Sequence, residues 1–164
     1  MSARTGTLTL TMPTEREIVM TRVFEAPRRL VFDAFTKPEL LRRWLLGPDG
    51  WSMPVCDIDL KVGGSYRYVW RHDTDGVEMS AAGVYREIVL GERVVATERF
   101  EPPWYPGEAL VSMALVEAGG RTTLTQTLRY ESREVRDVVL RSPMASGVEA
   151  SLDRLEGFLG APAR

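Results

Sequence analysis

The chain of 164 residues has the length of one ordinary domain and can bury a substantial core. Hydrophobic residues make up 44% of it and charged residues 27%, and the net charge of -2 excludes the strongly basic surface of a typical nucleic-acid-binding protein. No apolar run approaches the ~18 residues of a membrane span. Residues 1–15 lack the apolar core of a secretory signal. We expect one domain over 1–164 with a peripheral segment at 1–14, acting without nucleic acid or membrane.

Cysteine and histidine each occur once, as Cys56 and His72. A lone cysteine cannot form an internal disulfide, which favours a cytoplasmic location. We expect Cys56 to be buried and to serve only in core packing. His72 stands beside "DTDG" and is expected in water near a hairpin tip. One histidine and one cysteine make neither a zinc cluster nor a supported catalytic triad, so we expect no cofactor and no metal.

The first part of the chain predicts one strand followed by two short helices. Residues 16–24, "REIVMTRVF", alternate and are rich in β-branched side chains, which indicates a strand. A helix follows Pro27, with apolar residues at helical spacing: Leu30, Val31, Ala34 and Phe35. Lys37-Pro38 interrupts it, because the residue before a proline avoids the α conformation. A second short helix, over about 38–45, carries Leu41, Trp44 and Leu45 on one side.

Residues 52–130 read as a meander of about six strands separated by turns such as "HDTDG", "LGER" and "EAGGR". The clearest strand is 121–130, "RTTLTQTLRY". One face carries Thr123, Thr125, Thr127 and Arg129, and the other carries Leu124, Gln126, Leu128 and Tyr130. Such alternation is typical of an antiparallel sheet with one solvated and one covered face.

The C-terminal segment predicts the element that covers the sheet. Apolar and small residues recur at steps of three and four, which predicts a long helix over about 134–159: Val135, Val138, Ser142, Ala145, Val148, Leu152, Leu155 and Leu159. Pro143 falls within this stripe. Either the helix is kinked there, or Ser142 caps a new helix with Pro143 at its first position. The expected fold is α+β, a curved antiparallel sheet around a terminal helix.

Taken in order, five segments resemble one known family: "APRRLVFDAFTKPELLRRWLLGPDGW", "DIDLKVGGSYRYVWR", "GVYREIVLGERVVATERF", "TTLTQTLRYESREVRD" and "GVEASLDRLEGFL". The chain is similar to the START-like superfamily, which has the helix-grip fold, and to the branch named after the activator of heat-shock protein 90 ATPase. The resemblance implies about seven strands around a long C-terminal helix, with a cavity between them. Two departures concern that cavity: Leu45 where the family often has a second tryptophan, and Pro143.

Aromatic and methionine side chains concentrate where the resemblance places the cavity. Tyr66, Tyr68 and Trp70 alternate and so share one face of a strand. The candidate lining consists of Trp44, Trp51, Met53, Tyr66, Tyr68, Trp70, Met79, Tyr85, Met113, Gln126, Met144 and Val148. The alternative is that these side chains simply fill a solid core.

Polar residues in the predicted sheet offer few catalytic groups. Gln126 lies between two leucines on the covered face, so its amide needs a partner: a tyrosine hydroxyl, a buried water, or a ligand. Asp57 and Asp59 share a strand face, and cross-strand pairing with nearby Lys61, Arg67 and Arg71 is favoured over a metal site.

Three functions are compatible with the sequence. The favoured one is binding of a small apolar ligand in the cavity, without assigned catalysis. The second is a cyclase or dehydratase using the same cavity, and the third is a chaperone-interacting module, as the family name implies. The chain is expected to be a monomer or a homodimer.

Overall fold

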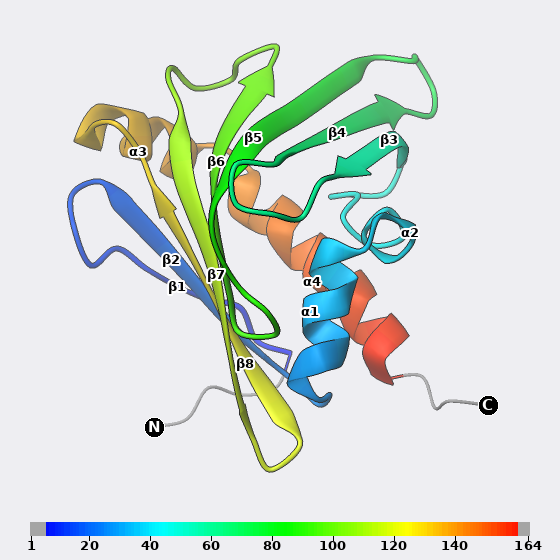
Figure 1. Cartoon of the computed structure of the whole chain (residues 1–164). Coiled ribbons are helices and arrows are strands. Elements are labelled where there is room, and N and C mark those ends of the chain that lie inside the picture. The colour runs from blue at the N-terminus through cyan, green and yellow to red at the C-terminus, as the bar shows by residue number, and fades with distance from the viewer. Residues whose placement is uncertain (1–5, 161–164) are drawn as a thin grey trace.

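The computed structural model describes residues 6–160, which form one curved antiparallel sheet of eight strands and four helices (Figure 1). The strand order is β1-β2-β8-β7-β6-β5-β4-β3, so β1 and β3 are the edges. The elements are β1 (Thr9–Thr11), β2 (Glu17–Phe24), α1 (Arg28–Thr36), α2 (Pro38–Leu41), β3 (Trp51–Ile58), β4 (Ser65–His72), β5 (Glu78–Val89), β6 (Arg93–Glu101), β7 (Ala109–Ala118), β8 (Arg121–Arg129), α3 (Arg133–Arg141) and α4 (Met144–Gly160).

This architecture confirms the predicted α+β helix-grip fold and its six-strand meander, β3 to β8. The expected count of about seven strands was one short. The additional strand is β1, which lies in the segment expected to be peripheral and pairs with β2 through Leu10 and Met20. Within residues 6–160 no helix is both long and apolar enough to cross a membrane.

The strand registers place side chains of the concave face in rows that run across the sheet. Gln126 of β8 lies between Met20 of β2 and Met113 of β7, and Met113 in turn lies beside Val94 of β6. We call these four residues the amide row. Because side chains alternate along a strand, every second residue of β6, β7 and β8 faces the same side as the amide row.

The first two helices follow the predicted break but differ in detail. α1 ends at Thr36, and Lys37 is extended between it and Pro38, which begins α2. Its buried face includes Phe32, whereas Leu30, expected on that face, is 38% exposed. α2 ends at Leu41 rather than near residue 45, because the chain tightens into a turn in which the Trp44 backbone N–H donates to the Leu41 carbonyl at 3.2 Å.

The C-terminal segment is two helices, so a single helix over 134–159 is not formed, and the alternative in which Ser142 caps a new helix is confirmed. α3 and α4 are separated by Ser142 and Pro143, and Ser142 is extended, with φ -85° and ψ 167°. The Ser142 hydroxyl accepts a hydrogen bond from the Met144 N–H at 3.2 Å, as expected of a residue that caps a new helix. Proline disfavours the α conformation of the residue before it and lacks a backbone donor, which explains the break.

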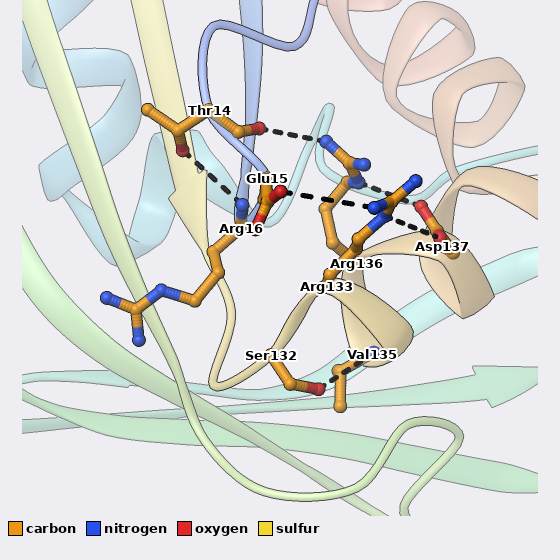
Figure 2. A network of polar contacts seen from close by, with 8 residues as sticks. All are labelled: Thr14, Glu15, Arg16, Ser132, Arg133, Val135, Arg136 and Asp137. Atoms are coloured by element: carbon orange, nitrogen blue, oxygen red, sulfur yellow. Dashed lines mark hydrogen bonds and ion pairs between the residues drawn. The ribbon is translucent and has the colours of Figure 1, made fainter.

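A network of polar contacts holds α3 against the β1–β2 turn (Figure 2). The Ser132 hydroxyl caps the helix by accepting from the Val135 N–H at 3.2 Å. Arg136 donates to the Thr14 carbonyl at 2.9 Å and pairs with Asp137 at 3.0 Å. These contacts fix α3 at one end of the sheet.

α4 crosses the hollow of the curved sheet beside α1 (Figure 1). It is held by Arg22 of β2, whose fully buried guanidinium pairs with Asp153 at 2.7 Å and with Glu156 at 3.2 Å. The same guanidinium lies 5.5 Å from the ring centroid of Phe24. Leu152 and Leu155 of α4 are each 1% exposed in the main core. α4 is therefore anchored in its second half, while its first half borders the cavity described below.

Candidate ligand-binding cavity

A cavity of about 800 Å³ lies between the concave face of the sheet and α4. Its walls come from β4 to β8, from the first half of α4, and from the segment that joins α2 to β3. All but one of the predicted residues line it: Trp44, Trp51, Tyr66, Tyr68, Trp70, Met79, Tyr85, Met113, Gln126, Met144 and Val148. The space is open, so these side chains do not pack into a solid core. Their contact with a ligand stays a prediction.

Met53 is the exception and does not line the cavity. Its side chain is 5% exposed and belongs to the main hydrophobic core. The pairing of β3 with β4 shifts between Ser52 and Val55, so regular alternation does not extend through this stretch. The Met53 carbonyl accepts a hydrogen bond from Arg42, just after α2, at 3.0 Å. Met53 therefore packs beside α2.

Aromatic side chains of β4 form one wall. The ring centroids of Tyr66 and Tyr68 are 4.9 Å apart, and those of Tyr68 and Trp70 are 5.9 Å apart. Tyr66 donates its hydroxyl to the Thr97 carbonyl at 2.6 Å, and the Trp70 indole donates to the Leu45 carbonyl at 2.7 Å. Because their polar atoms are bonded to the backbone, Tyr66 and Trp70 present apolar surface to the cavity.

The two tryptophans that flank "LLGPDG" have different positions. Trp44 is 1% exposed, and its indole donates to the Ala34 carbonyl at 3.0 Å, so it forms part of the buried inner wall of the cavity. Trp51 is partly exposed, with its ring 5.0 Å from that of His72. The loop between them faces α4: the Gly47 N–H donates to the Ser151 hydroxyl at 2.8 Å. Gly47 has φ 64°, a conformation that favours glycine.

The other polar candidates lie outside the cavity. Cys56 is buried as predicted, and burial raises the pKa of its thiol to about 11. Asp57 is exposed opposite Arg67 in the register of β3 and β4. No ion pair of Asp57 is found among residues 6–160. Asp59 pairs with Lys61, one of the expected partners, at 3.7 Å, but within its own turn and not across strands.

His72 ends β4 at the expected hairpin, but its side chain is only 31% exposed. Besides packing against Trp51, it lies with Nδ1 3.2 Å from a carboxylate oxygen of Asp75. Arg71, the next residue back, pairs across to Glu78 of β5 at 2.6 Å. These residues form a polar rim around the hairpin. Within residues 6–160, no three His, Cys, Asp or Glu side chains are grouped so as to hold a metal ion.

Gln126 points into the cavity from the middle of the amide row. Its Oε1 atom is buried and has no hydrogen-bond partner within the part of the chain that the structure describes. The tyrosine hydroxyl considered from the sequence is therefore not its partner. A buried acceptor without a partner is costly, on the order of 1–3 kcal/mol, so this atom is suited to a donor brought by water or ligand.

Glu98 of β6 also lines the cavity, and the sequence analysis missed it. Its carboxylate accepts a hydrogen bond from the Tyr105 hydroxyl at 3.3 Å. Desolvation raises the pKa of Glu98 from 4.5 to about 7, and the Tyr105 hydrogen bond opposes this shift only in part. The signal was present in β6, where Val94, Ala96, Glu98 and Phe100 alternate inward.

Aromatic rings surround the Glu98 end of the cavity. Tyr105 lies 5.3 Å from Tyr130 and 5.9 Å from Phe100, and Phe100 lies 5.4 Å from Trp104, measured between ring centroids. We call Glu98 and these four residues the acidic end. Desolvation raises the pKa of both Tyr105 and Tyr130, and the Glu98 charge adds to each shift. Both phenols therefore stay neutral near pH 7.

Known structures and families match nearly the whole chain. A family model described as Activator of Hsp90 ATPase homolog 1-like protein matches residues 25–160. A solved protein from Rhodobacter sphaeroides is 28% identical with a TM-score of 0.89, over 95% of this chain and 100% of that one. A solved protein from Chromobacterium violaceum is 25% identical with a TM-score of 0.78, over 91% of this chain and 100% of that one. No curated protein matches the chain.

A protein from Mycobacterium smegmatis shares the fold at lower identity, 20%, with a TM-score of 0.82 over 96% of this chain and 100% of that one. These matches confirm the START-like resemblance seen in the sequence motifs. The family model spans α1 to α4, and so includes most of the elements that line the cavity; Met20 of β2 lies outside the matched range. The chain belongs to the family of Activator of Hsp90 ATPase homolog 1-like proteins.

Proposed function

We propose that this protein binds a small, largely apolar molecule in the cavity between the sheet and α4. The observation that carries the proposal is the cavity itself, whose volume of about 800 Å³ is formed mainly by aromatic and aliphatic side chains. Pockets for small organic ligands typically have ~300–1,000 Å³ and combine such walls with a few polar groups. Gln126 and Glu98 are the polar groups that would orient the ligand.

Binding requires less of this site than catalysis does. A cyclase or dehydratase would need an acid and a base placed together at the reacting atoms. Among the lining residues that the structure describes, Glu98 is the one carboxylate, and its hydrogen-bond partner is a phenol with a raised pKa. A role in chaperone activation is suggested by the family's description alone, whereas the binding proposal has a physical site.

The direct test of ligand binding places a bulky side chain in the cavity by a substitution on β7. Val111 lines the cavity, whereas Val116 on the same strand is 65% exposed. N-phenyl-1-naphthylamine, a neutral apolar fluorophore, should bind the unaltered protein saturably with an increase in fluorescence. Val111→Trp should weaken this binding by about tenfold or more, since the indole occupies the same space, and Val116→Trp should leave it unchanged.

Circular dichroism and melting curves of both variants check that the fold is retained. Binding that does not saturate, or that Val111→Trp leaves unaltered in a folded protein, would show that the cavity is not a binding site.

A further inference from the structure

The charge balance of the cavity is unusual. Its lining contains one carboxylate, Glu98, and no lysine, arginine or histidine among residues 6–160. None of the ion pairs within that range includes Glu98, whose one hydrogen bond comes from the neutral Tyr105 hydroxyl. Glu98 is partly buried, and a charge that is removed from water without a partner is costly. Glu98 therefore lacks a counter-charge from its own chain.

We propose that the ligand carries a positively charged amine, which pairs with the Glu98 carboxylate while the apolar body of the ligand fills the remaining cavity. This inference rests on the proposed function and specifies the chemical class of its ligand. An ammonium group would supply the missing positive charge and donate hydrogen bonds to the carboxylate. The acidic end suits such a group, because the faces of Phe100, Trp104 and Tyr130 attract cations.

The same geometry disfavours other polar groups. A ligand carboxylate would bring a second negative charge into a desolvated site, which is unfavourable. A neutral hydroxyl would form a hydrogen bond but would leave the charge of Glu98 uncompensated. The cavity should therefore rank ligands that share one apolar body in the order amine, alcohol, carboxylate.

Gln126 does not change this ranking, because it lies in another part of the cavity. Glu98 is opposite Ala109 on β7, whereas Gln126 is opposite Met113, four residues further along the strand. With a rise of about 3.3 Å per residue and about 4.8 Å between strands, the two backbones are roughly 16 Å apart. One amine cannot contact both groups, so Gln126 is left for a different donor on the ligand body.

A matched series of probes tests the inference. 1-Naphthylmethylamine, 1-naphthylmethanol and 1-naphthylacetate share one ring system and differ in charge. We expect the amine to displace N-phenyl-1-naphthylamine at pH 8 with about tenfold higher affinity than the alcohol, and the carboxylate to be weakest. Glu98→Gln should abolish the preference for the amine. Glu101→Gln, an exposed position on the same strand, should leave it intact.

The pH dependence of the unaltered protein provides a test that needs no variant. Glu98, with a pKa near 7, must lose its proton before it pairs with the amine. Affinity for the amine should rise about tenfold from pH 6 to pH 8, while affinity for the alcohol stays constant. The titratable groups that interact with Glu98 are the phenols of Tyr66, Tyr68, Tyr105 and Tyr130, and desolvation keeps the pKa of each above this range.

The possible results distinguish a failure of the amine inference from a failure of the proposed ligand-binding function. If the neutral fluorophore binds but the amine has no advantage, or keeps its advantage in folded Glu98→Gln, the inference is wrong and the binding function stands. An amine affinity that does not change between pH 6 and pH 8 overturns it too. If the fluorophore itself does not bind, both proposals fail together.

Discussion

Arg22 and Glu98 are two charged residues on the concave face of one sheet, and they differ in whether the fold supplies an ion-pair partner. Arg22 is fully buried and pairs with two carboxylates of α4, Asp153 and Glu156. Glu98 lines the cavity and accepts one hydrogen bond, from a neutral phenol. The charge of Arg22 is compensated within the fold, whereas that of Glu98 is not. A compensated charge holds elements together, and an uncompensated one is available to a ligand.

The largest effect should come from removing the compensation of Arg22. In the double variant Asp153→Asn with Glu156→Gln, the guanidinium stays buried without a counter-charge. We expect the free energy of unfolding to fall by about 3 kcal/mol, the scale found when a buried ion pair loses one partner. Urea unfolding measures it, with Glu149→Gln on the exposed side of α4 as the control. A loss below about 1 kcal/mol would contradict a structural role for the pairing.

Glu98→Gln should have the opposite sign. A carboxyl whose pKa is raised from 4.5 to about 7 binds its proton more tightly in the folded state, so stability falls as pH rises through this window. Glutamine removes that cost. We expect the variant to be more stable by about 2–3 kcal/mol at pH 8, and to show no such advantage near pH 4.5. Urea unfolding at both pH values tests this, and a variant less stable at pH 8 would refute it.

Gln126→Leu examines a neutral group whose buried oxygen accepts no hydrogen bond among residues 6–160. Leucine has a similar volume and suits the flanking Leu124 and Leu128. Since the Gln126 Oε1 atom has no partner among the described residues, its loss should stabilise the empty protein by about 1 kcal/mol or leave it unchanged. Melting curves measure the effect. A loss of stability above about 1 kcal/mol would assign Gln126 a structural role.

Tyr105→Phe should give the smallest effect. The Tyr105 hydroxyl is the one group that lowers the pKa of Glu98, by donating a hydrogen bond at 3.3 Å. Without it, that pKa should rise further, by about half a unit. Carboxyl carbon shifts followed by NMR over pH 5–9 would report the midpoint directly. An unchanged or lower midpoint would show that the hydroxyl does not stabilise the charged form.

The fold was predictable because its patterns are long and regular. Residues 121–130 alternate without interruption, and the strand β8 matches that pattern closely. The helical stripe after residue 134 was equally clear, but spacing alone does not distinguish a kinked helix from two helices. The distinction depends on the extended conformation of Ser142 and on the hydrogen bond that its hydroxyl accepts.

The aromatic residues that line the cavity were predictable from the sequence, whereas its charged residue, Glu98, was not. Aromatic residues at alternate positions mark a shared face, and Tyr66 and Trp70 do line the cavity. Met53 was misplaced because the pairing of β3 with β4 is irregular near it. Glu98 was missed because a lone glutamate in a strand is usually solvated, and only the assembled sheet shows that it follows Val94 and Ala96 inward.

The joint at Ser142 and Pro143 has a kinetic consequence. Ser142, Pro143 and Met144 all line the cavity, and the helices on either side are anchored separately, α3 at the β1–β2 turn and α4 through Arg22. The wall at this point is thus a short non-helical joint between two separately anchored helices. We expect a ligand to enter and leave here, with rates that follow the motion of the joint. Pro143→Ala, by extending helical hydrogen bonding across it, should slow both association and dissociation of N-phenyl-1-naphthylamine in stopped-flow measurements and leave the affinity nearly unchanged.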